Sequence, residues 1–194
     1  ASMASIQVGK TMIETTKNIS TNIKEIRPHF LLSVPALSDK FMKGIIRGIE
    51  KKGLSKLFNA ALKVAYAYHG DGYRNGKWQG NRMLAPLYKM FDKIIFSKIR
   101  AEAFGGRLQY FVGGGALLDR EYQKFFTALG IPIYQGYGLS EASPIISANS
   151  PSGQKMGTSG RLVPNLDIKI CDENRIELPK GQPGEMVVRG ENVM

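Results

Sequence analysis

Two short apolar segments, each followed at once by glycines, place the strongest limit on what this chain can fold into. The strand candidates and their glycines are Leu108–Val112 with Gly113–Gly115, and Ile131–Tyr134 with Gly136 and Gly138. A helix-length segment from about Asp119 to Leu129 joins them and is closed by Gly130. Because a helical crossover of this length connects parallel neighbouring strands, we expect both glycine segments at the carboxyl edge of one sheet. Ligands bind at that edge in open α/β sheets.

The second glycine segment leads directly into side chains that can bind a phosphate and a cation. Ser140, Glu141 and Ser143 follow it within five residues. A hydroxyl can donate to a phosphate oxygen, and a carboxylate can hold Mg²⁺, a hard cation that prefers oxygen ligands. Glycine lets the backbone come close to a ligand, so we expect a tight loop at Gly136 and Gly138. The residues alone leave open an ordinary glycine-rich loop with a solvated Glu141.

Three segments, in order, resemble motifs of the adenylate-forming enzymes, the acyl-CoA synthetase and luciferase superfamily. They are Gly113–Leu117, similar to a G-G-A-P-L-type loop, Gln135–Glu141, similar to Q-G-Y-G-[LM]-[ST]-E, and Gly184–Gly190, similar to G-E-[ILM]-x-[VI]-x-G. Leu117 departs from the pattern, because many relatives have proline there. Asn22–Pro28 and Ser33–Pro35 are similar to the long-chain fatty-acyl-CoA synthetase branch.

This resemblance implies a ligase that activates a long-chain fatty acid with ATP and Mg²⁺ to an acyl-adenylate and pyrophosphate. Coenzyme A, the co-substrate, then takes the acyl group and AMP leaves. Ser140 would bond the α-phosphate, Glu141 would coordinate Mg²⁺, and both are the catalytic candidates. Tyr137 would stack on adenine. The nucleotide-binding residues that the resemblance implies are Gly113, Gly114, Gly115, Ala116, Gln135, Gly136, Tyr137, Gly138, Leu139 and Ser140.

Apolar periodicity outside this unit predicts the other elements of an α/β fold. Phe30–Val34 is a continuous apolar run of strand length, which predicts a strand covered on both faces. Asn22 and Glu25 have the spacing of a capping box that opens a short helix before it. Three longer helices are expected, from Ser38 as cap to Gly53 as stop, over Leu54–His69, and over Leu84–Phe104.

Composition changes near Ser150 and suggests a second unit. Leu166–Cys171 alternates apolar and polar residues, Glu185–Arg189 is a second strand candidate, and the turn-rich Pro179–Gly184 separates them. We therefore expect a mostly parallel sheet flanked by helices over residues 1–150, the α/β portion of an AMP-binding domain. The beginning of a β-rich, barrel-like subdomain is expected over residues 151–194.

The positive charge is concentrated in the first part of the chain. Residues 1–120 hold 20 Lys and Arg against 8 Asp and Glu, whereas residues 121–194 hold 7 against 8. A basic segment attracts nucleic acid, anionic lipid or a polyphosphate. A solvated helical surface is the alternative, since the basic residues recur at helical spacing. The lack of a zinc-finger or RNP pattern argues against sequence-specific nucleic-acid binding, and contact with an anionic membrane surface stays open.

Two other classes remain open on the sequence. Ala4–Thr11 matches a relaxed Walker A pattern, which would make the chain a P-loop-like nucleotide-binding module, although no apolar strand precedes it. The basic half would suit a peripheral membrane or scaffold domain. Cys171, the single cysteine, and the lack of an N-terminal signal pattern favour a cytoplasmic location, with periphery at the inner membrane face left open.

Three parts expected of a complete adenylate-forming enzyme do not occur in the sequence. They are a T-S-G-T-T-G-x-P-K-G-type phosphate loop, a T-G-D that supplies a ribose carboxylate, and a C-terminal lid with its lysine. We therefore expect an internal piece of a longer enzyme, inactive by itself. No apolar run approaches 18 residues, so no membrane-spanning helix is expected.

Overall fold

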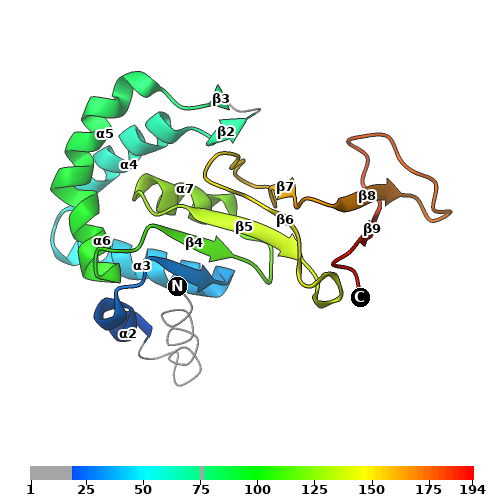
Figure 1. Cartoon of the computed structure of the whole chain (residues 1–194). Coiled ribbons are helices and arrows are strands. Elements are labelled where there is room, and N and C mark those ends of the chain that lie inside the picture. The colour runs from blue at the N-terminus through cyan, green and yellow to red at the C-terminus, as the bar shows by residue number, and fades with distance from the viewer. Residues whose placement is uncertain (1–18, 75–76) are drawn as a thin grey trace.

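The computed structural model describes residues 19–74 and 77–194 and has a mixed α/β architecture (Figure 1). Its helices are α2 (Ile19–Ile26), α3 (Pro35–Lys51), α4 (Ser55–His69), α5 (Ala85–Phe91), α6 (Ser97–Phe104) and α7 (Arg120–Ala128), with shorter turns η1 (Arg82–Leu84), η2 (Asp92–Phe96) and η3 (Ser140–Ala142). Its strands are β1 (Phe30–Ser33), β2 (Tyr73–Arg74), β3 (Lys77–Trp78), β4 (Tyr110–Gly113), β5 (Ile133–Gly138), β6 (Ile145–Ala148), β7 (Arg161–Leu162), β8 (Leu166–Cys171) and β9 (Glu185–Gly190). The Walker-like segment Ala4–Thr11 lies outside the described residues.

A five-stranded sheet in the order β1-β4-β5-β6-β7 organises the fold. The β1–β4 and β4–β5 pairs are parallel, and the β5–β6 and β6–β7 pairs are antiparallel. Helix α7 connects β4 to β5, as the helical crossover in the sequence predicted. The expected α/β class, with parallel neighbouring strands and flanking helices, is confirmed. Because β7 belongs to this sheet, the sheet continues beyond residue 150, and the division there stays a prediction.

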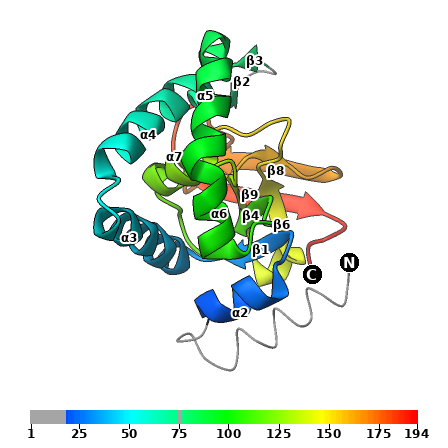
Figure 2. The same ribbon diagram turned by 90° about the vertical axis from the view of Figure 1, so that its left-hand side faces the viewer.

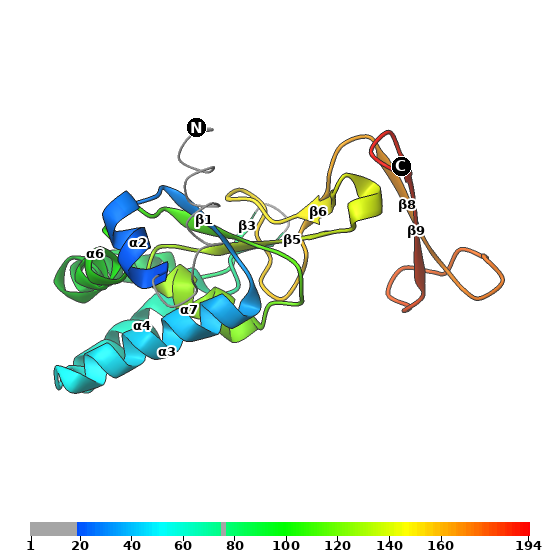
Figure 3. The same cartoon turned by 90° about the horizontal axis from the view of Figure 1, so that it is seen from below.

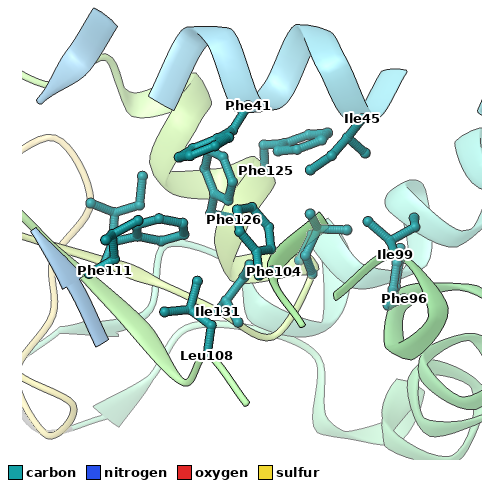
Figure 4. Packing of buried hydrophobic residues seen from close by; sticks show 14 of the residues in the cluster. Phe41, Ile45, Phe96, Ile99, Phe104, Leu108, Phe111, Phe125, Phe126 and Ile131 are labelled. Atoms are coloured by element: carbon teal, nitrogen blue, oxygen red, sulfur yellow. The ribbon is translucent and has the colours of Figure 1, made fainter. Parts of the chain in front are cut away.

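Aromatic side chains fill the core between the sheet and its helices (Figure 4). Phe111 of β4 lies with its ring centroid 5.1 Å from that of Phe126 on α7 and 5.6 Å from that of Phe104 on α6. Phe41 of α3 meets Phe104 edge-to-face at 5.2 Å. Figure 3 shows α3, α4 and α7 together on one side of the sheet.

The other face of the parallel strands is open, which corrects the expectation of a strand covered on both faces. Leu31 is 1% exposed, whereas its neighbour Leu32 is 61% exposed. Leu32 pairs in register with Val112, which is 36% exposed, and Val112 pairs with the half-buried Tyr134. A continuous apolar run predicts that helices cover both faces of a strand. The residues described here supply helices to only one face of the sheet.

Two predicted helix caps are wrong, although the helices themselves are present. Helix α2 has already begun at Ile19, so Asn22 lies inside it and cannot be its N-cap. Helix α3 begins at Pro35, a residue favoured at the first helical position because its missing N–H is not needed there. Ser38 is therefore inside α3, where its Oγ lies 3.0 Å from Ser33 Oγ.

The helix stops follow the sequence more closely. Gly53 has φ 68° just after α3, as expected of a stop residue, and Gly105 has φ 73° after α6. The helix expected over Leu84–Phe104 runs through α5, η2 and α6, with a π-helical segment at Asp92–Phe96. No helix among residues 19–74 and 77–194 is long and apolar enough to cross a membrane.

Strands β8 and β9 form a separate antiparallel hairpin, as the alternating sequence predicted. The hairpin extends away from the five-stranded sheet (Figures 1 and 3). Its end returns to the segment after β5, because Asn192 Nδ2 donates to Ala142 O at 2.7 Å and Met194 N donates to Glu141 O at 2.9 Å. The hairpin thus holds the backbone of the candidate catalytic turn.

Candidate functional site

The two glycine motifs lie side by side at the carboxyl edge of the parallel strands, as predicted. Gly113 at the end of β4 pairs in register with Gln135 of β5 on one side and with Ser33 of β1 on the other. Gly114 N donates to Ser33 O at 3.3 Å, which continues the sheet by one step. The ends of β1 and β4 therefore lie beside Gln135 at one edge, and β5 continues beyond them through Gly138.

The loop expected at Gly136 and Gly138 is a strand instead. Both residues belong to β5 and pair with β6, with Gly136 opposite Ala148 and Gly138 opposite Ile145. A Cβ on Gly138 would lie 1.7 Å from Pro144 O, so glycine is required there by the close approach of two strands. Two glycines within three residues predict a loop, because nothing in the local sequence indicates the partner strand β6.

Gln135 is directed into the protein and not toward the open edge. It is 3% exposed, and its Oε1 accepts from Gln123 Nε2 at 3.2 Å. Gln123 Oε1 in turn accepts from Gly157 N at 2.7 Å, and Asn149 Nδ2 donates to Gln135 O at 3.1 Å. This buried network fixes β5 to α7 and to the loop after β6, so the Gln135 side chain acts here by positioning the strand.

Sequence reasoning missed the other members of this network. Gln123 is fully buried on the apolar face of α7, and Asn149 and Gln154 are each 7% exposed. Gln154 Nε2 donates to Ile133 O at 3.1 Å, which ties the same loop to β5. One signal in the sequence could have indicated the network: Gln123 lies on the face of α7 that also carries the buried phenylalanines.

From Tyr137 near the end of β5 onward, the chain presents its motif side chains to solvent. Tyr137 is 39% exposed and Leu139 is 45% exposed, and Ser140 and Glu141 are exposed on the turn η3. Ala142, only 3% exposed, anchors that turn. An aromatic face, a hydroxyl and a carboxylate therefore follow one another along the open edge.

The first glycine segment forms the adjacent wall of the edge. Gly113 is buried, Gly114 is partly exposed, and Gly115 and Ala116 are exposed. Gly115 has φ 80°, a left-handed conformation that side chains other than glycine rarely adopt. The wall is closed by buried Leu118, while the preceding Leu117 is 80% exposed.

The position of Glu141 suits a single protein ligand of a nucleotide-bound Mg²⁺. It does not suit a metal site formed entirely by protein side chains. Residues 19–74 and 77–194 contain no group of three or more His, Cys, Asp or Glu that could hold a metal ion. Mg²⁺ in nucleotide sites is typically held by one or two carboxylates together with phosphate and water oxygens. A single exposed carboxylate, such as that of Glu141, is enough for a site of this kind, whereas a structural metal centre needs more protein ligands.

Away from this edge, one buried histidine has a shifted proton affinity. His69 packs against the rings of Tyr68, Trp78 and Tyr88, and neither of its buried ring nitrogens has a hydrogen-bond partner. Burial lowers the pKa of His69 to about 4, so the ring is neutral at pH 7. This histidine is the last residue of α4 and does not lie in the motif segments.

Comparison with known proteins gives a family and a fold. A protein-family model described as AMP-binding enzyme matches residues 3–194. The chain is 31% identical over 201 residues to the probable acyl-activating enzyme 16, chloroplastic, of Arabidopsis thaliana, covering 91% of this chain and 28% of that protein. It is 29% identical over 174 residues to the long-chain-fatty-acid–CoA ligase FadD15 of Mycobacterium tuberculosis, covering 90% of this chain and 27% of that protein.

Solved structures of CoA ligases share the fold. A benzoate CoA ligase from Burkholderia xenovorans LB400 superposes with a TM-score of 0.55 at 20% identity, over 93% of this chain and 26% of that one. The anthranilate CoA ligase AuaEII in complex with anthranoyl-AMP gives a TM-score of 0.54 at 17% identity, over 91% of this chain and 24% of that one. The chain thus spans 24–28% of the length of these curated relatives and solved chains.

Proposed function

Because the chain belongs to the AMP-binding enzyme family, we propose that it is part of an ATP-dependent fatty-acid–CoA ligase. Such an enzyme joins a fatty acid to AMP, releases pyrophosphate, and then transfers the acyl group to coenzyme A. Relatives named as long-chain-fatty-acid–CoA ligases, among them one from Mycobacterium tuberculosis and one from Saccharomyces cerevisiae, support a long-chain fatty acid as the substrate.

One observation carries this proposal: the register of β4 and β5 brings both motif segments to the same edge. With Gly113 opposite Gln135, the exposed Gly115 and Ala116 lie in the segment beside the one that carries Tyr137. In the proposed site the Tyr137 ring stacks on adenine. The exposed backbone after β4 lines the acyl carboxylate, because glycine lets a ligand approach the backbone closely.

The remaining roles belong to the turn after β5. The Ser140 hydroxyl donates to an oxygen of the α-phosphate, and the Glu141 carboxylate is a ligand for Mg²⁺. Mg²⁺, when bound, supplies charge neutralisation at the reacting phosphorus and the leaving pyrophosphate. Glu141 and Ser140 hold their places through the buried Ala142 and the backbone bond from Met194 N to Glu141 O.

Three finer assignments belong to the same proposal. The parent enzyme works in the cytoplasm, and residues 151–194 begin a β-rich subdomain of it. Ala4–Thr11 does not act as a P-loop in this proposal, since a P-loop follows a buried strand and no apolar run precedes Ala4 in the sequence. Substitution Lys10→Ala in the parent should therefore leave ATP binding unchanged; a loss of ATP binding would favour the P-loop-like module.

The proposal is tested with the variant Glu141→Gln in the full-length parent. Pyrophosphate release with a long-chain fatty acid should fall by roughly a hundredfold or more, because a group that stabilises developing charge is lost. The melting temperature should stay close to that of the parent, since Glu141 is exposed. Glu50→Gln, an exposed position on α3, is the matched control. Unchanged pyrophosphate release in Glu141→Gln would remove Glu141 from the mechanism.

A further inference from the structure

Gln135 marks the point where β5 loses one of its two neighbouring strands. Strand β4 ends at Gly113, which pairs in register with Gln135. The next residues, Gly136 and Tyr137, pair with β6 alone among the strands that the structure describes. The register of that pairing then shifts between Tyr137 and Gly138. The place of the Tyr137 ring therefore depends on how firmly β6 is held to β5.

The segment that carries Tyr137 has little stiffness of its own. The residues on either side of Tyr137 are Gly136 and Gly138. Glycine has more backbone freedom than any other residue, so these two do not fix the direction of the ring. A ring that must be ordered when its ligand binds lowers the affinity, because ordering it costs free energy. A support outside the glycine segment would hold the ring ready for a ligand.

Asn149, the residue after β6, is placed to give this support. Its backbone N donates to Gln135 O at 2.9 Å, and its side-chain Nδ2 donates to the same oxygen at 3.1 Å. One residue thus binds twice to the last position of β5 that still has β4 beside it. Asn149 is 7% exposed, and a hydrogen bond is electrostatically stronger in such a buried place than in water.

The loop that follows β6 holds the rest of the Asn149 amide. Nδ2 also donates to Thr158 O at 2.6 Å, and Oδ1 accepts from Lys155 N at 3.0 Å. Both amide hydrogens and the amide oxygen therefore have partners, which fixes the side chain in one orientation. The loop itself passes beside β2, where Gly72 and Lys155 form an isolated β-bridge (Figures 1 and 2).

We propose that Asn149 is a positioning residue for adenine binding. Its side chain fastens β6 to β5 at Gln135, and this sets where the Tyr137 ring, two residues farther along β5, meets the nucleotide. The inference rests on the proposed function, in which that ring stacks on adenine. Asn149 is buried and acts through the strand, without touching the ligand.

Gln154 offers a matched comparison within the same loop. It is also 7% exposed, and its Nε2 donates to another carbonyl of β5, Ile133 O, at the same distance of 3.1 Å. Ile133 lies four residues before Tyr137 and pairs with Phe111, so β4 still supports β5 there. Removing either amide takes away a buried side-chain hydrogen bond to β5, but only Asn149 holds the strand where β4 has ended.

The test compares Asn149→Ala with Gln154→Ala in the full-length parent by ATP–pyrophosphate exchange. In Asn149→Ala the KM for ATP should rise roughly fivefold or more, because a misplaced ring loses its stacking on the base. The KM for the fatty acid should stay within about twofold, since that substrate does not use the ring. Gln154→Ala should lose a similar amount of stability in urea but keep its KM for ATP within about twofold of the parent. The same KM for ATP in both variants would show a merely structural role and overturn the proposal.

An isosteric variant tests the donated hydrogen bond without opening a cavity. Asn149→Asp keeps an acceptor for Lys155 N but has no hydrogen to donate to Gln135 O at neutral pH. Its KM for ATP should rise as in Asn149→Ala, with urea unfolding used to show that the variant is folded. A folded Asn149→Asp with the KM for ATP of the parent would contradict the proposal, whatever the state of Asn149→Ala.

Tyr137→Ala separates a failure of this inference from a failure of the proposed function. It should raise the KM for ATP at least as much as Asn149→Ala, and the double variant should add little, because both changes act through one ring. Independent, additive increases in the double variant would overturn the inference. An unchanged KM for ATP in Tyr137→Ala would contradict the adenine contact itself, and the inference with it. A raised KM in Tyr137→Ala beside an unchanged KM in Asn149→Ala would overturn the inference alone.

Discussion

At the scale of single residues, strand alternation decides which motif side chains can touch a ligand. Gln135 follows Ile133 on the helix-covered face and is buried in a hydrogen-bonded network. Tyr137, Ser140 and Glu141 lie farther along the chain and are exposed. The motif contains all four residues, but the direction of the Gln135 side chain depends on Gln123, which belongs to neither glycine motif.

The buried network predicts a stability effect at a position the motif does not include. Gln123→Leu would leave Gln135 Oε1 and Gly157 N without their partner, at a cost of about 1–3 kcal/mol for each unsatisfied group. Urea unfolding of the parent should show this loss. Gln109→Leu, at an exposed position, is the control, and equal stability of both variants would show that the network contributes little.

His69 predicts a pH dependence of stability. Its pKa in the folded state is lowered from 6.5 to about 4 by burial, so the unfolded chain binds the proton more readily. Stability from this group is fully present above pH 6.5 and falls as the pH drops toward 4, by at most about 3 kcal/mol. The variant His69→Phe should lose this part of the pH dependence. The free energy of unfolding of both proteins at pH 7 and pH 5 provides the check, and an identical pH response would rule the effect out.

At the scale of elements, apolar stripes located the helices well and polar caps located them poorly. Phe41, Ile45 and Ile49 are buried on α3 as their spacing indicates, because packing against the sheet determines helix position. Ser38 and Asn22 have cap-forming side chains, but Pro35 and the earlier start of α2 set the actual helix beginnings. Residues with cap-forming side chains also occur inside helices. Their presence alone therefore does not show where a helix begins, which depends on packing.

The extension of β5 through its glycines could not be read from the local sequence. A glycine in a strand becomes necessary only when another backbone approaches it closely. Here the approaching backbone is that of Pro144, the residue before β6. The antiparallel partner is a tertiary contact, whereas residues 135–138 by themselves suit a loop equally well.

This pairing predicts different results for two glycines of the site. Gly138→Ala would place a Cβ 1.7 Å from Pro144 O, so β5 and β6 must separate, at a cost of about 2 kcal/mol or more. Gly114→Ala meets no atom within 4 Å and should be close to neutral. Thermal melting of the two variants distinguishes them. If Gly138→Ala melted with Gly114→Ala, the close strand approach at Pro144 would be wrong.

At the scale of the whole molecule, the sheet is packed on one face and open on the other. Leu32 and Val112 are neighbours on the open face of the sheet, and both are exposed. The chain spans about 27–28% of the length of two named relatives. The sequence predicted the class of fold and the edge where the motifs meet, because local periodicity and one crossover are enough for both. It could not show which sheet face is covered, since that depends on packing between distant segments.

The groups that the sequence does not contain limit the chemistry that this chain can perform. The proposed site supplies adenine contacts, one hydroxyl and one carboxylate along a single edge. The phosphate loop, the ribose carboxylate and the lid lysine do not occur in the 194-residue sequence. Loss of three such groups, at about 3–4 kcal/mol each, would remove most of the rate enhancement of an adenylate-forming enzyme.

The most direct test is ATP–pyrophosphate exchange with a long-chain fatty acid and Mg²⁺, measured on the 194-residue chain beside its full-length parent. We expect clear exchange from the parent, which depends on Glu141, and only background exchange from the chain, because one wall of the site cannot orient the triphosphate. Robust exchange from the chain alone would show that the catalytic groups have been misassigned, and a parent without exchange would contradict the ligase assignment.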